Sequence, residues 1–287
     1  MRTIADDSLP AERLSGERRI QADALPAHER RRRRPRFPVA LVGVLVLVLA
    51  WEVIVRALRV QAFVVPPPST VLRELVAEPR VFATATAATL AEAVGGFALA
   101  AAAASAFAVG AVHSRLLDRV LTPLVVLSQT IPIITLAPLL VLWFGYGTLP
   151  RFVVCALVAF FPMAVTALEG FRSTDPELLL LLRSVDASRW DVFWRVRLPH
   201  AGPFLAAGAR TGATLSFVGA VVADWTASGR GLGYVVLSAT SRLATAQALA
   251  AVVIICLLGL LAYGSVGLLE RRIGWWNRSD PKMKRML

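Results

Sequence analysis

The chain has 287 residues, is 56% hydrophobic and contains only 17% charged residues, well below the roughly 25% usual in soluble domains. This composition excludes an ordinary soluble globular protein, and the formal charge of +12 gathers in the polar ends, so it does not by itself indicate a nucleic-acid partner. Apolar runs of about 20 residues, the length that crosses a bilayer as helix, recur along the sequence. The predicted fold is all-α, a polytopic membrane protein with about six transmembrane helices.

Residues 1–36 form a polar head that holds ten arginines and ends in the run RRRRRPR. Such a segment buries too little apolar surface to fold, which predicts disorder. We interpret the arginines as a positive-inside topology signal and a contact with anionic lipid. An RNA-binding arm is the alternative, but no aromatic residues interleave with the arginines to stack on bases. The head is also too long for a cleaved signal peptide, so the first apolar run is expected to be retained.

The first two predicted spans differ in composition. The first, about 37–58, is rich in Val and Leu, and the three prolines that follow it end the helix. A short amphipathic surface helix comes next, with Ser69 or Thr70 as its expected cap. The second span, about 81–112, is dominated by Ala, Gly, Ser and Thr. Since small side chains let helix backbones approach closely, we expect an interior, tightly packed helix.

The third predicted span, about 120–143, is interrupted by Pro123, Pro132 and Pro138. Neighbouring helices or water must satisfy the backbone groups that prolines free, so this helix should line the protein interior. HSRLLDR is the expected loop before it, and FGYGTLP the expected turn after it.

The last three spans are predicted at about 151–171, 204–226 and 246–269, with ASGRGLGYVVLSATSR as a connector between the last two. Six spans place both termini on one side. Of the 31 basic residues, 23 lie in the head, in HSRLLDR, in residues 172–203 and after Glu270, whereas Arg151 and six others fall on the opposite side. The richer side is therefore predicted to be cytoplasmic.

The predicted organisation is a disordered basic cytoplasmic head (1–36), a transmembrane domain (37–271) and a cytoplasmic tail (272–287). Cys155 and Cys256 lie in apolar runs, and the three histidines are scattered, so no metal site is expected.

Between the fourth and fifth spans, a long polar stretch leaves the bilayer. Its part ASRWDVFWRV predicts a short helix with Asp186 as N-cap and an end at Leu198–Pro199. One side of this helix is expected to carry Trp190, Phe193, Trp194 and Arg197. Two interpretations are open: the helix lies among lipid headgroups, or it docks into a groove of a soluble partner.

If the chain transports a solute, its sequence should also indicate the source of energy. The only lysines, Lys282 and Lys284, follow no Gly-rich loop, so a nucleotide-binding P-loop cannot be built and any ATPase is a separate polypeptide. An ion-coupled carrier would place ionisable residues within its spans. The candidates are Glu52, Glu92, Arg210 and Asp224, for which interhelical hydrogen bonding or capping is the other interpretation.

The polar stretch resembles the cytoplasmic signature of permease subunits of binding-protein-dependent ABC importers, which reads Glu-Ala-Ala, three residues, Gly, nine residues, Ile-x-Leu-Pro. Here Leu180–Leu182 takes the first positions, Asp186 the glycine position and Val196–Pro199 the last, at the right spacing. The loss of Glu at Leu180 removes a charge available for an ATPase contact. Asp tolerates the positive φ that a glycine position can require better than most residues.

Further segments resemble one branch of that family, the nitrate/sulfonate/taurine type, over nearly the whole chain after the head. They are PPPSTVL, QTIPIITLAPLLVLWFGYG, FRSTDPELL, and GAVVADW followed by GLGYVV. The resemblance implies a type I ABC importer transmembrane domain that acts as a homodimer by alternating access. It implies an ABC ATPase subunit that binds ATP and Mg, and an extracytoplasmic solute-binding protein. No catalytic residue and no cofactor is expected in this chain.

The resemblance also implies site residues. A coupling segment, about 175–199, would dock onto the ATPase through Arg183, Asp186, Ala187, Ser188, Arg189, Trp190, Leu198 and Pro199. Asp224 and Trp225 are expected at the outer mouth as a gate or receptor contact.

The substrate is the least determined feature. The quoted segments are most similar to those of permeases for hydroxymethylpyrimidine-type thiamine precursors. Sulfonate, taurine, nitrate and riboflavin remain alternative substrates. The alternative functions are an ion-coupled secondary transporter that depends on Glu92 or Asp224, and a non-transporting membrane scaffold.

Overall fold

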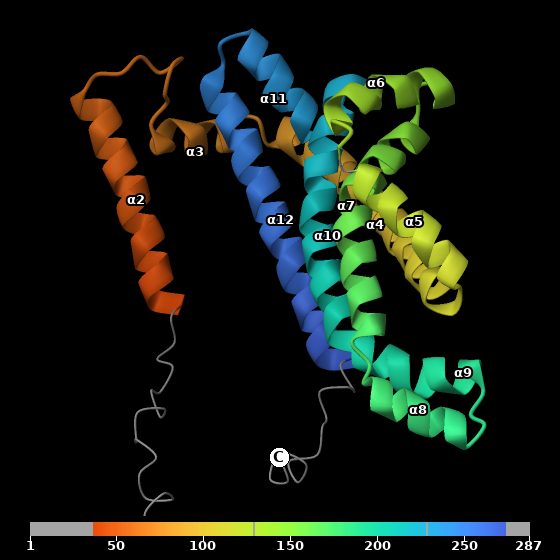
Figure 1. Ribbon diagram of the computed structural model, residues 1–287. Coiled ribbons are helices and arrows are strands. Elements are labelled where there is room, and N and C mark those ends of the chain that lie inside the picture. Colours follow the sequence, from red (N-terminus) through yellow and green to blue (C-terminus); the bar gives the residue numbers. More distant parts are fainter. Residues whose placement is uncertain (1–36, 129, 228, 274–287) are drawn as a thin grey trace, which may run out of the picture. The chain divides into compact units, whose positions relative to one another are not determined.

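The computed structural model describes residues 37–128, 130–227 and 229–273, and the regular elements in them are all helices (Figure 1). Contacts divide the chain into two units, 1–50 and 51–287. Helix α2 (Phe37–Ala57) begins in the first unit, and its 21 residues match the first predicted span. The predictions for the head and for all but the first two residues of the tail lie outside the described residues.

Four helical segments in the described part of the chain are long and apolar enough to cross a bilayer. Three are α4 (Pro79–His113), α7 (Thr148–Arg172) and α12 (Thr245–Ile273), and the fourth runs from Arg189 to Thr226 and contains most of α10 (Leu198–Ala227). They correspond to the second, fourth, sixth and fifth predicted spans. The all-α polytopic prediction is confirmed, although the fifth helix begins before residue 204.

Helix α7 packs against both α4 and α10 through small residues. Gly96 of α4 and Gly219 of α10 both face Cys155 of α7, and a Cβ added to Gly219 would lie 2.6 Å from the Cys155 Cα. Because that neighbour is backbone, it cannot rotate away, and close packing requires glycine there. The predicted tight packing of the second span is confirmed for the face of α4 that carries the fully buried Ala100 and Ala104.

The prediction of one continuous third span is wrong. The region forms α5 (Arg115–Ser128) and α6 (Ile133–Phe144), each too short to cross a bilayer alone. Pro132, at φ −63° and ψ 114°, is extended and ends the helical path before α6. One face of α6 is interior, since Ala137 and Leu140 are buried. HSRLLDR is not a loop, because only Ser114 separates α4 from α5.

The connectors also differ from prediction in two places. Helix α3 (Pro68–Ala77) is preceded by Pro67, and neither Ser69 nor Thr70 caps it; Glu52 accepts the Ser69 N–H at 3.0 Å instead. The connector before α12 contains the ten-residue helix α11 (Leu232–Ser241). The predicted turn before α7 is confirmed, with Gly145 at φ +76°.

Candidate coupling site and a buried polar cluster

The coupling segment begins with helix α8 (Pro176–Ser184), whose C-terminus is closed by a Schellman motif. The Asp186 N–H donates to the Arg183 carbonyl at 3.2 Å, and the Ala187 N–H donates to the Leu182 carbonyl at 3.0 Å. This motif needs a left-handed residue at its turn, and Asp186 has φ +53°. The expectation of positive φ at the glycine position of the signature is confirmed.

The next helix, α9 (Arg189–Val192), is capped by Ser188. The Ser188 Oγ accepts the Asp191 N–H at 3.1 Å and donates to Asp191 Oδ2 at 2.5 Å, so it satisfies one of the free amides at the start of the helix. Asp186 as the N-cap is therefore wrong: it belongs to the end of the preceding helix. The Ser-x-x-Asp spacing in the sequence was the signal that identifies the true cap.

The helix does not end at Leu198–Pro199. A π-helical turn, η2 (Phe193–Arg197), leads directly into α10. Pro199 has no N–H to donate to Arg195, and its ring crowds that carbonyl, so a widened turn accommodates it. The helical path is consequently continuous from Arg189 to Ala227, and it changes direction between α9 and α10 (Figure 1).

The predicted aromatic face is divided between interior and surface. Phe193 is buried and packs on Phe171 of α7 and His113 of α4, with ring centroids 5.4 and 5.2 Å apart. Trp190 and Trp194 stack on each other and are 60% and 59% exposed. Phe193 anchors the segment, and the tryptophan pair faces outward. No local sequence signal assigned His113 to this contact, because α4 brings it from 77 positions before Trp190.

A groove of about 960 Å³ opens beside these aromatic rings. Four of the predicted coupling residues line it: Arg183, Asp186, Ala187 and Arg189. Of the other predicted residues, Ser188 is the cap of α9, and Leu198 packs on the core around Phe193. The structure thus brings half of the predicted set together at one cavity.

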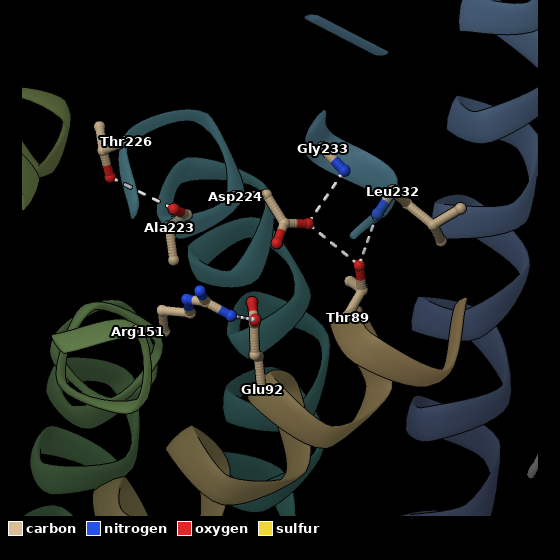
Figure 2. Close-up of polar contacts among 8 residues, drawn as sticks. All are labelled: Thr89, Glu92, Arg151, Ala223, Asp224, Thr226, Leu232 and Gly233. Atoms are coloured by element: carbon tan, nitrogen blue, oxygen red, sulfur yellow. Dashed lines mark hydrogen bonds and ion pairs between the residues drawn. The ribbon is translucent and has the colours of Figure 1, made fainter. Parts of the chain in front are cut away.

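At the opposite end of α10 lies a buried polar cluster made of Thr89, Glu92, Arg151 and Asp224 (Figure 2). The Thr89 hydroxyl donates to Asp224 Oδ2 at 3.0 Å. Thr89 Oγ1 and Asp224 Oδ2 also accept the N–H groups of Leu232 and Gly233, at 2.7 and 3.0 Å. These are the first amides of α11, which have no partners within their own helix. Helices α4 and α10 therefore cap α11.

Glu92 and Arg151 form a buried ion pair between α4 and α7, at 2.8 Å. The Glu92 carboxylate also interacts electrostatically with Asp224. The cluster therefore contains one arginine and two carboxylic acids. Arg151, counted above among the basic residues of the side opposite the cytoplasm, is not at the surface, since it is 5% exposed within α7. Arg151 and Thr89 are the site residues that the sequence missed, because their partners are 59 and 135 positions away.

The two remaining candidates, Glu52 and Arg210, are paired as well. Glu52 binds Arg56 and Ser69, and Arg210 binds Glu270. Interhelical bonding or capping, the alternative to ion coupling, is confirmed for all four candidates. Asp224 is 1% exposed and Trp225 42%, so only Trp225 presents a surface to another molecule. Within the described part, no group of three His, Cys, Asp or Glu residues is placed to hold a metal ion.

Comparison with known proteins agrees with this geometry. Residues 96–275 match the family model of the binding-protein-dependent transport system inner membrane component. A probable ABC transporter permease protein of Haemophilus influenzae is 33% identical, covering 83% of this chain and 96% of the relative. The formylaminopyrimidine transport permease protein ThiX of Halalkalibacterium halodurans is 31% identical, covering 82% and 94%. The taurine transport system permease protein TauC of Escherichia coli is 32% identical, covering 81% and 87%.

The family match spans α7, the coupling segment and α10, and it includes most of the two sites described above. The chain therefore belongs to the inner membrane components of binding-protein-dependent transport systems: it is a multi-pass ABC importer permease, a translocating subunit without a catalytic role.

Proposed function

We propose that residues 175–199 dock onto a separate ABC ATPase, and that helix α10 carries the resulting motion to the buried polar cluster. One observation supports this most directly: the helical path from Arg189 to Ala227 is unbroken. It has exposed tryptophans at one end and Asp224 at the other. A displacement imposed at Trp190 would pass through the η2 turn to α10 and strain the contacts that hold α11, because no break in the helical backbone separates the two ends.

The coupling segment has the surface of a docking site. Outside the candidate spans, Leu180, Leu181 and Val185 are 63%, 62% and 68% exposed. Together with the tryptophan pair they form an apolar area that water disfavours and a partner would cover. Exposed carboxylates at Asp175, Glu177, Asp186 and Asp191 balance the charge of the arginines in residues 175–199, which leaves little net attraction to an anionic membrane surface. Protein docking is thus the better supported of the two interpretations.

The buried polar cluster is the proposed gate at the extracytoplasmic side. Asp224 and Thr89 hold the start of α11, and Trp225 is exposed next to them. In this arrangement both termini are cytoplasmic, which agrees with the distribution of arginines. A solute-binding protein would deliver substrate to a pore formed by two copies of this chain, while the partner ATPases bind ATP and Mg.

The proposed substrate is a small polar organic solute of the thiamine-precursor pyrimidine class. The similarity to a formylaminopyrimidine permease supports this class, and the similarity to a taurine permease keeps sulfonates as the second candidate. Calorimetric titration of the cognate solute-binding protein with hydroxymethylpyrimidine, taurine and nitrate separates them. Binding of taurine alone would overturn the pyrimidine assignment.

Docking is tested with the full-length chain in lipid nanodiscs and the ATPase that co-purifies with it. The double variant Trp190→Ala/Trp194→Ala is expected to weaken ATPase binding at least tenfold, because central aromatic residues dominate interfaces. Trp143→Ala is the matched control, since Trp143 of α6 is also exposed, at 64%, but lies outside the coupling segment. Unchanged binding in the double variant would contradict the proposal.

A further inference from the structure

The groove beside α8 and α9 is strongly basic. Its lining includes three arginines, Arg183, Arg189 and Arg197, and a single carboxylate, Asp186. We call it the arginine groove. Its walls come from α8, from α9 with η2, and from the end of α4, which supplies Val112 and His113. Three separate helical elements therefore build one concave, positively charged surface.

The side chains of the three arginines have no hydrogen bond or ion pair to any residue that the structure describes. Arg183 and Arg197 are close enough for their charges to repel each other, and Arg197 is half-buried. Bringing like charges together without a counter-ion is unfavourable, particularly where water is partly excluded. With three arginines and one carboxylate in its lining, the groove has a net positive charge that an anionic group from outside the chain would balance.

Arg195, on the same η2 turn, shows the contrast. It does not line the groove, its side chain is 81% exposed, and it pairs with Asp191 at 3.4 Å. Arg172 likewise pairs with Asp118. Basic residues around the groove are thus satisfied within the chain, whereas those inside it are not.

We infer that the arginine groove receives one or more Asp or Glu side chains of the partner ATPase, an inference that rests on the proposed docking of the coupling segment. The groove adjoins the exposed tryptophan pair through Phe193, so a protein that covers the tryptophans reaches the groove as well. Guanidinium groups bind carboxylates with two parallel hydrogen bonds, which fixes orientation as well as affinity. The tryptophans supply buried area, and the groove sets the register of the partner.

The test measures ATPase binding to the full-length chain in phosphatidylcholine nanodiscs over a range of NaCl concentrations. Arg183→Ala/Arg197→Ala is expected to weaken binding about tenfold at low salt and to flatten its salt dependence, because a screened charge contact is lost. Arg183→Lys/Arg197→Lys should retain the salt dependence and part of the affinity. Arg172→Ala is the control, because Arg172 lies outside residues 175–199 and pairs with Asp118, and it should change binding less than twofold.

A charge-reversal experiment identifies the partner residues. Arg183→Glu/Arg197→Glu should abolish binding, and Lys substituted for an Asp or Glu on the ATPase docking surface should restore it. If the alanine double variant keeps wild-type affinity and salt dependence while Trp190→Ala/Trp194→Ala loses binding, the inference fails and the docking proposal stands. If neither double variant weakens binding, both fail. An effect of the arginine variants seen only in nanodiscs containing phosphatidylglycerol would assign the groove to lipid headgroups and overturn the inference.

Discussion

Figure 1 traces the helical path from Arg189 to Ala227. Charged side chains are arranged differently at its two ends. At the α9 end, aromatic rings are exposed and arginines of the groove face one another without a described counter-ion. At the Asp224 end, each charged side chain of the buried polar cluster is buried and has a partner from another helix. The α9 end is suited to bind a second protein, whereas the Asp224 end holds helices of the same chain together. The following predictions test that contrast.

The largest effect is expected from removing one member of the buried ion pair. Glu92→Leu leaves the Arg151 charge without the Glu92 carboxylate in a buried site and should lower the free energy of unfolding by about 3–5 kcal/mol. Thermal unfolding in detergent, followed by circular dichroism, measures the loss. The double variant Glu92→Leu/Arg151→Met should recover most of it. A double variant as unstable as the single one would show that the pair does more than neutralise charge.

Close packing between α7 and α10 should give the next effect. Gly219→Ala places a Cβ 2.6 Å from the Cys155 Cα and should cost about 1–3 kcal/mol through overpacking. Gly264→Ala in α12 is the control, since a Cβ there meets nothing within 4 Å. Equal melting temperatures for both variants would argue against the tight contact.

Thr89 is expected to act locally. Thr89→Val removes the acceptor of the Leu232 N–H and a donor to Asp224, at a cost of about 1–3 kcal/mol. Because α11 alone loses a cap, hydrogen exchange should accelerate at its first amides and stay unchanged in α12. Uniform acceleration over both helices would indicate general destabilisation instead.

The smallest effect is expected at the exposed turn of the coupling segment. Asp186 has φ +53°, so Asp186→Gly should be neutral or stabilise slightly, and Asp186→Val should cost about 1–2 kcal/mol. The relative melting temperatures of the two variants test this order. A valine variant as stable as the glycine variant would contradict the assigned backbone conformation.

The helices of the spans were largely predictable from the length of their apolar runs, because a spanning helix must satisfy its backbone internally. The third span was not, since hydrophobicity continues through Pro132 while the backbone turns extended there. Local signals also relate to the turns of the coupling segment. The glycine position of the signature predicts the conformation of Asp186, and the Ser-x-x-Asp spacing, rather than Asp186, marks the cap of α9.

The pairings within the two sites could not be predicted from the sequence. Glu92 meets Arg151 and Thr89 meets Asp224 across helices far apart in the chain, and no spacing rule relates such positions. Similarly, Phe193 and Trp190 look equivalent on a helical projection, but α4 and α7 bury only Phe193. Tertiary packing, rather than local pattern, decides which polar and aromatic residues become interior.

The central claim, that docking at the tryptophan pair moves the buried polar cluster, is tested by labelling residue 225 in the assembled transporter. Trp225→Cys is introduced with the exposed Cys256 replaced by Ala, while the buried Cys155 is kept. We predict that ATP binding by the ATPase changes the rate of thiol labelling at residue 225, and that Trp190→Ala/Trp194→Ala abolishes this change at saturating ATPase. A labelling rate that ATP does not alter, or alters equally in both backgrounds, would contradict it.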